Sequence, residues 1–489
     1  LLTYVDFASL PLGQMVSTFP NQNQHMLYTV LANFTMNVFG HDFAGFRMPA
    51  VLFGVGSLPF LFLLGRRTNG TREAWLATLL MTFAYHHVWF SQNARGYSGL
   101  LFFTLAATWL LLVALERRRT GYWVAYSACL ALGLWVHMTM LFVAMAHAAA
   151  YGLELALDLA QGRRDRGRAV PSLPAILLAW FFGATLTTQL YALALPEFFA
   201  HALHEVSLES DWTNPMWVFR EMIARLRDVG VVGVGAFIGL GVMILGWLNL
   251  FRRDRVAAVS MALPGILGGA TMLALGHNLW PRFFFFCAGF ILLTLARGAF
   301  RTPEFIAGFF VNRDRAAMWG RRVGTAGLAL LIGAAVWTLP NVYKHPKQDY
   351  SGARDYVVAE MGPQDEAVSV GLAGTAFGRY FAPDWPVPES AEELDGLVRA
   401  HRTVWLVHTL SIQLKAWHPD IWETMQRDFE VVRTFPGTLG GGEVMVSRSL
   451  PSAGVVGSVE GTPEGAGPDG VVPGEAPTDS TATGSGESR

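Results

Sequence analysis

The chain alternates long apolar stretches with short polar segments between residues 45 and 339. Several stretches approach the roughly 20 residues that a perpendicular helix needs to cross a bilayer. Their interiors contain almost no ionisable side chains, which are costly in hydrocarbon. The pattern predicts an all-α polytopic membrane bundle of about ten transmembrane helices. The expected spans are 45–65, 74–90, 97–115, 122–136, 138–157, 173–195, 229–251, 256–276, 283–299 and 323–339.

The sequence changes character on both sides of this bundle. Upstream, the amphipathic run MLYTVLANFTMNVFG (26–40) is too short to span and predicts a helix lying on the bilayer surface. Downstream, strand-like and helix-like segments predict a small α/β domain. Its expected helices are 347–361 and 411–429, and its expected strands are 367–372, 403–410, 430–435 and 443–449.

The last segment predicts no packed structure. Residues 451–489 contain no aromatic residue, Leu, Ile or Lys and are rich in Gly, Pro, Ser, Thr and Glu. Such a composition cannot bury enough apolar surface to fold, so we expect a disordered tail. The expected domains are therefore an outer segment (1–44), the membrane domain (45–339), the α/β domain (340–450) and the tail (451–489).

Arginine placement predicts the orientation of the bundle. Alternate gaps between the expected spans carry nineteen arginines in one set and five in the other. Because positive residues favour cytoplasmic loops, the arginine-rich gaps are expected inside the cell. Residues 1–44, the Arg95 loop, 196–228, the Arg282 loop and everything after residue 340 would then lie outside.

Composition narrows the class of protein. With 52% hydrophobic and 15% charged residues, the chain is not an ordinary soluble protein, and its net charge of -1 gives no indication of nucleic-acid binding. Cys129 and Cys287 both lie in apolar runs, so neither is expected in a disulfide or metal site. No metal-ligand spacing or nucleotide-binding loop is visible in the sequence, which predicts no required metal and no cofactor.

One polar interruption stands between two apolar spans, at 91–98. It contains Ser91, Gln92, Asn93, Arg95, Tyr97 and Ser98. In the simpler interpretation Arg95 is a snorkelling residue at the membrane boundary. Flanked by Gln92 and Tyr97, it can instead offer a planar, permanently charged fork to a phosphate.

The other informative polar residues fall in the gaps expected outside. Arg282 is a second candidate for phosphate binding, or else an interfacial anchor. His25, His86, His87 and His137 are candidates for substrate contacts, or else polar ends of spans. The long outer loop carries three carboxylates, Glu205, Glu209 and Asp211. In the simpler interpretation they are solvated charges. In the alternative interpretation one of them binds the acceptor or a divalent ion.

This layout favours a reaction at the outer membrane surface on a lipid phosphate. The lipid tail can stay in the bilayer while its phosphate meets Arg95 and Arg282. If a sugar is transferred, the phosphate is the leaving group, and fixed positive charge stabilises it. A carboxylate is then needed to take the proton from the incoming hydroxyl, with attack from the opposite face of the sugar.

Three stretches carry a resemblance to a known family. They are VWFSQNARGYSGLLFFTLAATWLLLVALE (88–116), the upstream run from Asn23 to Arg67, and WPRFFFFCAGFILLTLARG (280–298). Together they resemble polytopic glycosyltransferases with the GT-C fold, over about residues 9–300 and more loosely through 450. That family includes bacterial protein mannosyltransferase-like enzymes, lipid A aminoarabinose transferases and related lipopolysaccharide sugar transferases.

The resemblance implies a polyprenyl-phosphate sugar donor, with Gln92, Arg95, Tyr97 and Arg282 at its phosphate. Gln24-His25-Met26 departs from the family's His-Pro-Pro, which leaves acceptor choice open. The family's acidic pair should lie upstream of Ser9–Met15, so we expect the catalytic base and a first span before Leu1. Asp6 is the less favoured candidate for the base.

We therefore expect an inverting membrane glycosyltransferase of the bacterial cytoplasmic (inner) membrane. It would move a hexose or pentose to an envelope acceptor, which the sequence leaves open among lipid A or lipopolysaccharide, polysaccharide and protein. Two alternatives remain. One is a flippase or transporter of lipid-linked sugars, which needs polar groups within the spans. The other is a non-enzymatic partner that docks another envelope protein through the α/β domain.

Overall fold

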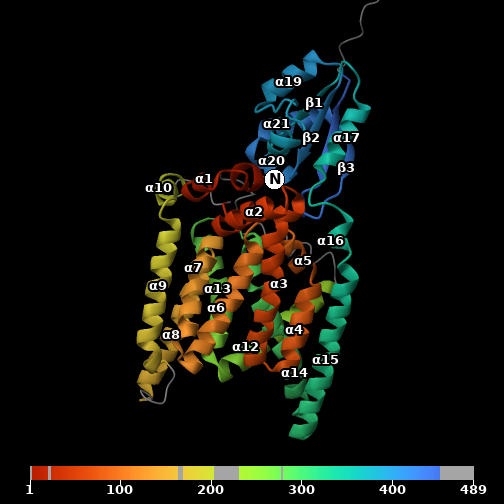
Figure 1. Cartoon of the computed structure of the whole chain (residues 1–489). Helices are drawn as coiled ribbons and strands as arrows, with labels where there is room; N and C mark the ends of the chain where they lie inside the picture. Colours follow the sequence, from red (N-terminus) through yellow and green to blue (C-terminus); the bar gives the residue numbers. More distant parts are fainter. Residues whose placement is uncertain (1–2, 20–23, 163–168, 203–230, 277–278, 452–489) are drawn as a thin grey trace, which may run out of the picture. The chain divides into compact units, whose positions relative to one another are not determined.

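The computed structural model describes residues 3–19, 24–162, 169–202, 231–276 and 279–451 (Figure 1). Leu1–Ser449 forms one compact unit. Within the described residues, eight helices are long and apolar enough to cross a membrane. The predicted helical membrane bundle with a small α/β region is thus confirmed, and the chain is a multi-pass membrane protein. The predicted domain boundaries stay predictions, and the predicted disordered tail lies outside the described residues from 452 onward.

The bundle is built from helices that run back and forth between two polar ends. Its members are α3 (Phe43–Thr68), α4 (Thr71–Phe83), α5 (Tyr85–Ser91), α6 (Tyr97–Arg117), α7 (Thr120–Val136), α8 (Met140–Ala160), α9 (Leu173–Tyr191), α12 (Val231–Arg253), α13 (Arg255–Ala274), α14 (Ala288–Ala307) and α15 (Arg313–Thr338). Short turns flank them: η2 (Val170–Ser172), α10 (Leu195–Glu197), η3 (Phe198–Ala202), η4 (Pro281–Cys287) and α16 (Asn341–Lys344).

Two of the ten expected spans are shorter than a bilayer crossing requires. The span expected at 74–90 is divided between α4, with 13 residues, and α5, with 7, because Ala84 adopts an extended backbone between them. Helix α7 has 17 residues and falls just below the usual length. The sequence does carry a polar signal at this point, because His86 and His87 directly follow Ala84, but the expected span runs through them.

The N-terminal segment packs onto the bundle through the predicted surface helix. It begins with η1 (Thr3–Ala8) and α1 (Leu12–Ser17), followed by α2 (Met26–Phe39). Half of the α2 residues are buried, including Tyr28, whose hydroxyl donates a 2.6 Å hydrogen bond to the Phe46 carbonyl of α3. The other face of α2 leaves Phe34 and Phe39 exposed. An amphipathic helix of this kind, one face packed and one apolar face open, suits a membrane surface.

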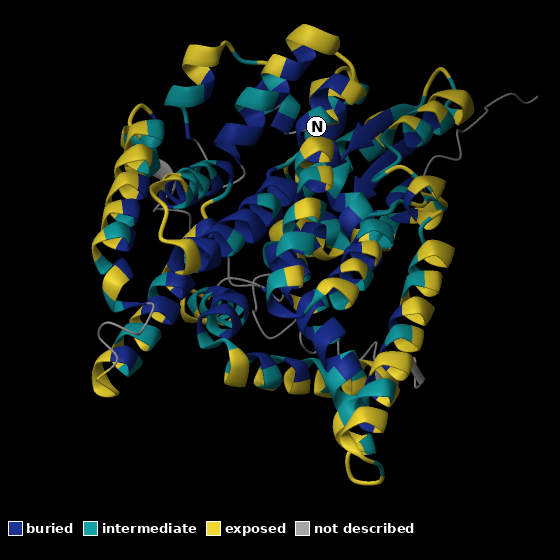
Figure 2. Ribbon diagram, turned by 60° about the horizontal axis from the view of Figure 1, so that its bottom comes forward, coloured by how far each residue is buried: buried dark blue, intermediate teal, exposed yellow. Residues whose placement is uncertain are grey.

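Burial identifies α6 as the central helix. In the candidate spans, 89% of the α6 window is buried, against 11% for both α12 and α15 (Figure 2). The exposed positions of α12 and α15 include Phe237, Leu330 and Trp337, which is the pattern expected of a lipid-facing surface. Because α6 begins directly after the Arg95 loop, that loop is anchored to the best-packed helix of the bundle.

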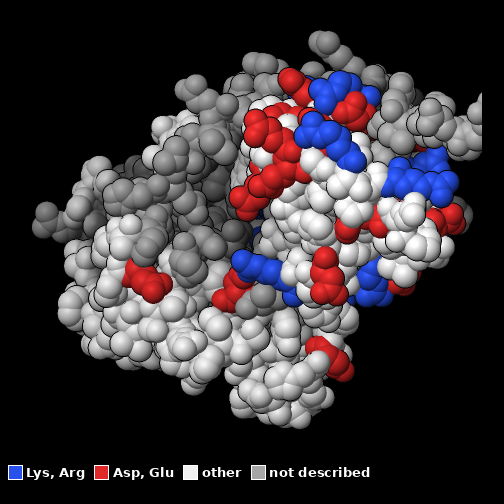
Figure 3. Space-filling model, turned by 90° about the horizontal axis from the view of Figure 1, so that it is seen from above, with Lys and Arg blue, Asp and Glu red and all other residues white. Residues whose placement is uncertain are grey.

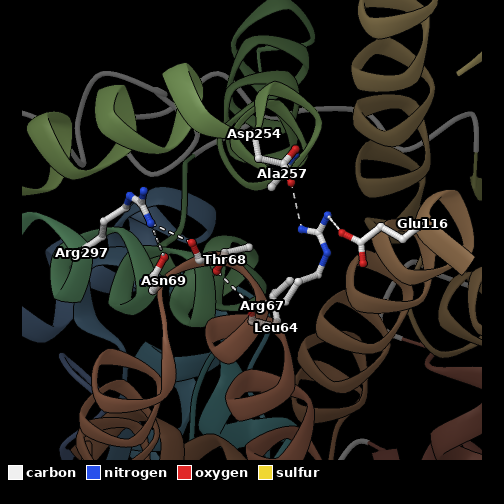
Figure 4. Close-up of polar contacts among 8 residues, drawn as sticks. All are labelled: Leu64, Arg67, Thr68, Asn69, Glu116, Asp254, Ala257 and Arg297. Carbon is white, nitrogen blue, oxygen red and sulfur yellow. Dashed lines mark hydrogen bonds and ion pairs between the residues drawn. The ribbon is translucent and has the colours of Figure 1, made fainter. Parts of the chain in front are cut away.

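The bundle end opposite the Arg95 loop is fastened by polar contacts (Figure 4). Arg67 at the end of α3 pairs with the exposed Glu116 of α6 at 2.6 Å and with Asp254, which caps α13, at 2.9 Å. Arg297 of α14 is buried and donates to the Thr68 carbonyl at 2.7 Å. Removing Thr68's partner would leave a buried polar group unsatisfied, so the Arg297 contact helps to hold the α3–α4 turn in place.

The C-terminal region contains a four-stranded mixed sheet in the order β1-β2-β4-β3. The strands are β1 (Glu366–Ser369), β2 (Val404–Thr409), β3 (Phe429–Phe435) and β4 (Val444–Ser449). Strand β1 pairs parallel to β2, and the other pairs are antiparallel. The accompanying helices are α17 (Tyr350–Glu360), α18 (Leu372–Ala376), η5 (Phe377–Phe381), α19 (Ala391–Ala400), α20 (Ser411–Trp417) and α21 (Pro419–Asp428).

Both faces of the central strand are covered, which explains its unbroken apolar sequence. Trp405 and Val407 of β2 join a core that includes Val357 of α17, whereas Val404 and Leu406 join the core on the opposite face. All four predicted strands and the helix at 347–361 are present. The single helix expected at 411–429 is instead two helices, because His418 leaves the helical conformation and Pro419 begins a new helix.

We predict that Gly298→Val destabilises the bundle. A Cβ at Gly298 would lie well inside van der Waals contact with the Val242 carbonyl of α12, so α12 and α14 would be forced apart. Overpacking of this kind costs about 1–3 kcal/mol or more of unfolding free energy. The measurement is the fraction of purified protein that stays monodisperse after graded heating.

Gly327→Val in α15 is the matched control, since a Cβ there meets nothing within 4 Å. Equal melting of the two variants would contradict the close α12–α14 packing.

Candidate functional site

The candidate site is built around the loop between α5 and α6, which carries Arg95. Helix α5 ends where the Gln92 amide donates to the Val88 and Trp89 carbonyls, and the Arg95 amide then donates to the Asn93 carbonyl at 2.6 Å. Gly96 starts α6 in close contact with its neighbours, because a Cβ there would lie 2.6 Å from the Val136 carbonyl oxygen. The loop is therefore a fixed turn with little room for a larger residue.

Three rings from different segments meet beside this loop. The ring centroid of His25 lies 4.8 Å from that of His137 and 5.6 Å from that of Tyr97, and Tyr97 lies 5.6 Å from His137. His25 precedes α2, His137 follows α7, and Tyr97 opens α6. The structure thus brings together three residues that the sequence predicts as separate candidates.

Both histidines of this cluster favour the neutral form. Burial and the positive charges of His137 and Arg95 hold the pKa of His25 well below its usual value. Burial and then Arg95 lower the pKa of His137 to about 4. The Nδ1 atom of His137 accepts a hydrogen bond from the Thr139 amide at 3.2 Å, and His25 Nε2 is buried with no hydrogen-bond partner among the described residues. Neutral imidazoles at this position can donate or accept hydrogen bonds without adding repulsive charge.

Several cations converge on the same end of the bundle. Arg95 and Tyr97 act electrostatically on Arg282, which is exposed and lies over the rings of Trp280 and Phe283. Arg47 of α3 and Lys347 belong to the same charge cluster, since Arg47, Arg95 and Arg282 all act on Lys347. Like charges this close disfavour one another, so the arrangement suits an anion.

Lys347 and Trp89 are site residues that the sequence did not predict. The Lys347 ammonium donates to Asn93 Oδ1 at 3.2 Å and lies 5.0 Å from the centre of the Trp89 ring. The Trp89 indole donates to Thr438 Oγ1 at 3.0 Å. The rarity of lysine could have drawn attention to Lys347, because the chain has only two others, Lys344 and Lys415. Nothing in the local sequence, however, relates residue 347 to residue 93.

The remaining predicted histidines lie apart from the ring cluster. His87 is buried against α3, where its Nε2 lies 3.2 Å from the Gly54 carbonyl oxygen and 3.3 Å from Ser57 Oγ. His86 is exposed, and its ring contacts Tyr85. The structure therefore supports His25 and His137 as neighbours of Arg95 and assigns His87 to helix packing.

Asp6, the less favoured candidate base, is held in an ion pair. Its carboxylate lies 2.5 Å from the Arg379 guanidinium of η5 in the C-terminal region. The three carboxylates Glu205, Glu209 and Asp211 lie outside the described residues. Among the described residues, no group of three or more His, Cys, Asp or Glu is arranged to hold a metal ion.

Acidic and basic side chains are interspersed on the face shown in Figure 3, with a largely uncharged surface around them. The described part of this face therefore has no large patch of a single charge. A compact group of guanidinium and ammonium groups, with neutral rings beside it, can bind and stabilise a phosphate ester at the end of a membrane bundle.

These features define a multi-pass membrane protein with a cluster of cations at one end of its helices. Residues 24–182 match the family model described as dolichyl-phosphate-mannose-protein mannosyltransferase. The matched segment runs from the residue before His25 into α9 and contains the whole Arg95 loop. It supports the predicted resemblance over residues 24–182 of the chain.

The chain is also similar to solved structures at low sequence identity. ArnT from Cupriavidus metallidurans in the apo state shares 13% identity over 87% of this chain and 88% of that one, with a TM-score of 0.48. The same enzyme bound to undecaprenyl phosphate gives 12% identity, coverage of 86% and 87%, and a TM-score of 0.42. The Archaeoglobus fulgidus oligosaccharyltransferase tethered with an acceptor peptide gives 10% identity, coverage of 86% and 65%, and a TM-score of 0.45. A comparison with curated protein sequences gave no significant match.

We predict that the folded protein loses stability as pH falls from about 6.5 to about 4. In this window an unfolded histidine binds a proton that folded His137, with its pKa of about 4, does not bind. The unfolded state is therefore favoured as pH falls, and stability is fully present only above about pH 6.5. His137→Gln should flatten this part of the profile.

The measurement is the thermal unfolding of wild type, His137→Gln and His418→Gln across that pH range. His418 lies outside the ring cluster, so its variant should follow wild type. An identical pH slope for wild type and His137→Gln would show that His137 is not held neutral.

Proposed function

We propose that the protein transfers a hexose or pentose from a polyprenyl-phosphate donor to an envelope acceptor on the outer face of the bacterial inner membrane. The observation that carries this proposal is the convergence of Arg95 and Arg282 beside Tyr97, the first residue of α6. The matched family acts, by its name, with dolichyl-phosphate-mannose, and ArnT has been solved with undecaprenyl phosphate. A polyprenyl phosphate satisfies both the charge and the membrane setting of this site.

Phosphate binding is assigned to the loop and the turn before α14. Arg95 and Arg282 neutralise the phosphate as it becomes the leaving group, so their contribution is largest in the transition state. Gln92 and Tyr97 orient phosphate oxygens by hydrogen bonding. His25 and His137 contact the donor or acceptor as neutral groups.

The acceptor hydroxyl needs a general base, for which a carboxylate is the expected group. Attack on the sugar from the face opposite the phosphate would invert its configuration. Asp6 Oδ1 accepts a hydrogen bond from Arg379, and this ion pair stabilises the charged carboxylate and so makes it a weaker base. We therefore assign Asp6 to holding the N-terminal segment against the C-terminal region.

The orientation of the bundle in the membrane is inferred from the distribution of arginines between its two ends. The Arg67 end of the bundle carries most of the arginines and is assigned to the cytoplasm by the positive-inside rule. The Arg95 end and the C-terminal region would then face outward, where envelope acceptors are found. Lipid A or lipopolysaccharide, polysaccharide and protein all remain possible acceptors.

We predict that Arg95→Ala lowers kcat/KM for sugar transfer by about 10²–10³, the usual cost of removing one transition-state charge donor. The measurement is transfer by the purified protein, expressed from its complete reading frame, with a polyprenyl-phosphate-linked sugar. Arg117→Ala is the matched control, because Arg117 hydrogen-bonds Tyr122 at the other end of α6. Turnover by Arg95→Ala within threefold of wild type would refute the proposed phosphate site.

The same assay tests Asp6. Asp6→Asn should retain most of the turnover, since the assigned role is structural. A loss as large as that of Arg95→Ala would instead assign Asp6 as the base.

We predict no flux of lipid-linked sugar when the protein is reconstituted into liposomes without an acceptor. Transport needs polar groups open to a path through the spans. His147 is an ionisable residue within the span α8. It is buried, with Nε2 3.1 Å from Thr108 Oγ1 and Nδ1 3.2 Å from the Tyr126 hydroxyl, so it does not line an open path. Acceptor-independent flux above that of empty liposomes would favour the transporter alternative.

A further inference from the structure

The C-terminal region contributes one charged side chain directly to the Arg95 loop. Lys347 follows α16, and its ammonium reaches Asn93 Oδ1 at 3.2 Å, two residues before Arg95. It also lies over the Trp89 ring at 5.0 Å. The ammonium is thus bound by an amide oxygen and an aromatic face, both of which leave a donor available for a further acceptor.

The backbone around Lys347 is fixed by the loop between β3 and β4. The Thr438 amide donates to the Pro346 carbonyl at 2.9 Å, and the Leu439 amide donates to the Lys347 carbonyl at 3.2 Å. Gly437 lies so close that a Cβ there would be 2.5 Å from the Lys347 carbonyl oxygen. Thr438 in turn accepts the hydrogen bond from Trp89. The ammonium is therefore held in position by several short contacts from two sides.

The charges that act on Lys347 are all positive. Arg95 of the loop, Arg282 of η4 and Arg47 of α3 add to burial and lower the pKa of Lys347 to about 7. The other groups in contact with it, Asn93, Trp89 and the loop 436–439, carry no titratable side chain. Lysine can lose its proton in such surroundings, whereas arginine cannot, and this distinguishes Lys347 from its three neighbours.

We propose that Lys347 is a donor-phosphate ligand that binds a phosphate oxygen together with Arg95 and takes up a proton from solvent when the anion arrives. This rests on the proposed function, in which Arg95 and Arg282 bind the same phosphate. The anion brings negative charge to Lys347, on which the acting charges are positive, so the charged ammonium becomes favoured in the complex. Binding and proton uptake are then linked, and affinity falls as pH rises through neutrality.

The experiment measures the Kd of undecaprenyl monophosphate for the full chain in nanodiscs at about pH 6 and about pH 8.5. Lys347→Ala should weaken binding about tenfold or more at the lower pH, the usual effect of losing one charged hydrogen bond, and less at the higher pH. Lys347→Arg should bind like wild type at the lower pH and lose less affinity at the higher one. Comparing variants at each pH cancels the titration of the lipid itself.

Lys344→Ala is the matched control. This substitution removes the same charge as Lys347→Ala, but from an exposed side chain three residues away. Thr438→Ala removes the Trp89 hydrogen bond and tests whether docking alone explains the effect; it should keep the wild-type difference between the two pH values.

Lys347→Ala binding within twofold of wild type at about pH 6, while Arg95→Ala loses binding, would overturn this inference and leave the proposed function standing. Wild-type binding by both variants would overturn the proposed phosphate site itself. A steep pH dependence that persists in Lys347→Arg would assign the titration to another group.

Discussion

Repulsion among like charges is the constraint on which the site depends. Arg47, Arg95, Arg282 and Lys347 come from four different segments; the three arginines act on Lys347, and Arg95 also acts on Arg282. Holding cations together costs free energy that packing elsewhere must supply, and the cost is offset when an anion enters. The neutral state of His25 and His137 avoids adding to the repulsion. Under the proposed function, the donor phosphate would offset this repulsion.

The rest of the bundle provides the rigidity that this requires. At the far end, Arg67, Glu116 and Asp254 join α3, α6 and α13, and Arg297 fastens α14 to the α3–α4 turn. Along its length α6 is buried on almost every side. Because α6 carries Tyr97 at its start and Glu116 near its end, both polar ends are connected by one well-packed helix. Displacement of one end would have to deform the core.

Much of this could be predicted from the sequence, since apolar runs and arginine placement follow directly from the cost of burying charge. The Arg95 loop stood out because polar residues interrupt a long apolar region, and the strands of the C-terminal region stood out by composition. Lys347 did not, because its contact with Asn93 joins positions 254 residues apart. His86 and His87 directly follow the α4–α5 break at Ala84, and Pro419 marks the division of α20 from α21, yet the sequence pattern predicts each pair of helices as one element. A contact between residues far apart in the chain cannot be identified from the local sequence pattern, whereas the periodicity of a helix or strand can.

The β3–β4 loop has a consequence for how such enzymes can be recombined. Thr438 and Leu439 reach the membrane domain's phosphate end through Trp89 and the Lys347 backbone. Exchanging the C-terminal region for another would thus also replace groups that contact the segment 89–93 before Arg95. A chimaera that keeps the geometry of this segment would have to retain the β3–β4 loop together with residues 345–349.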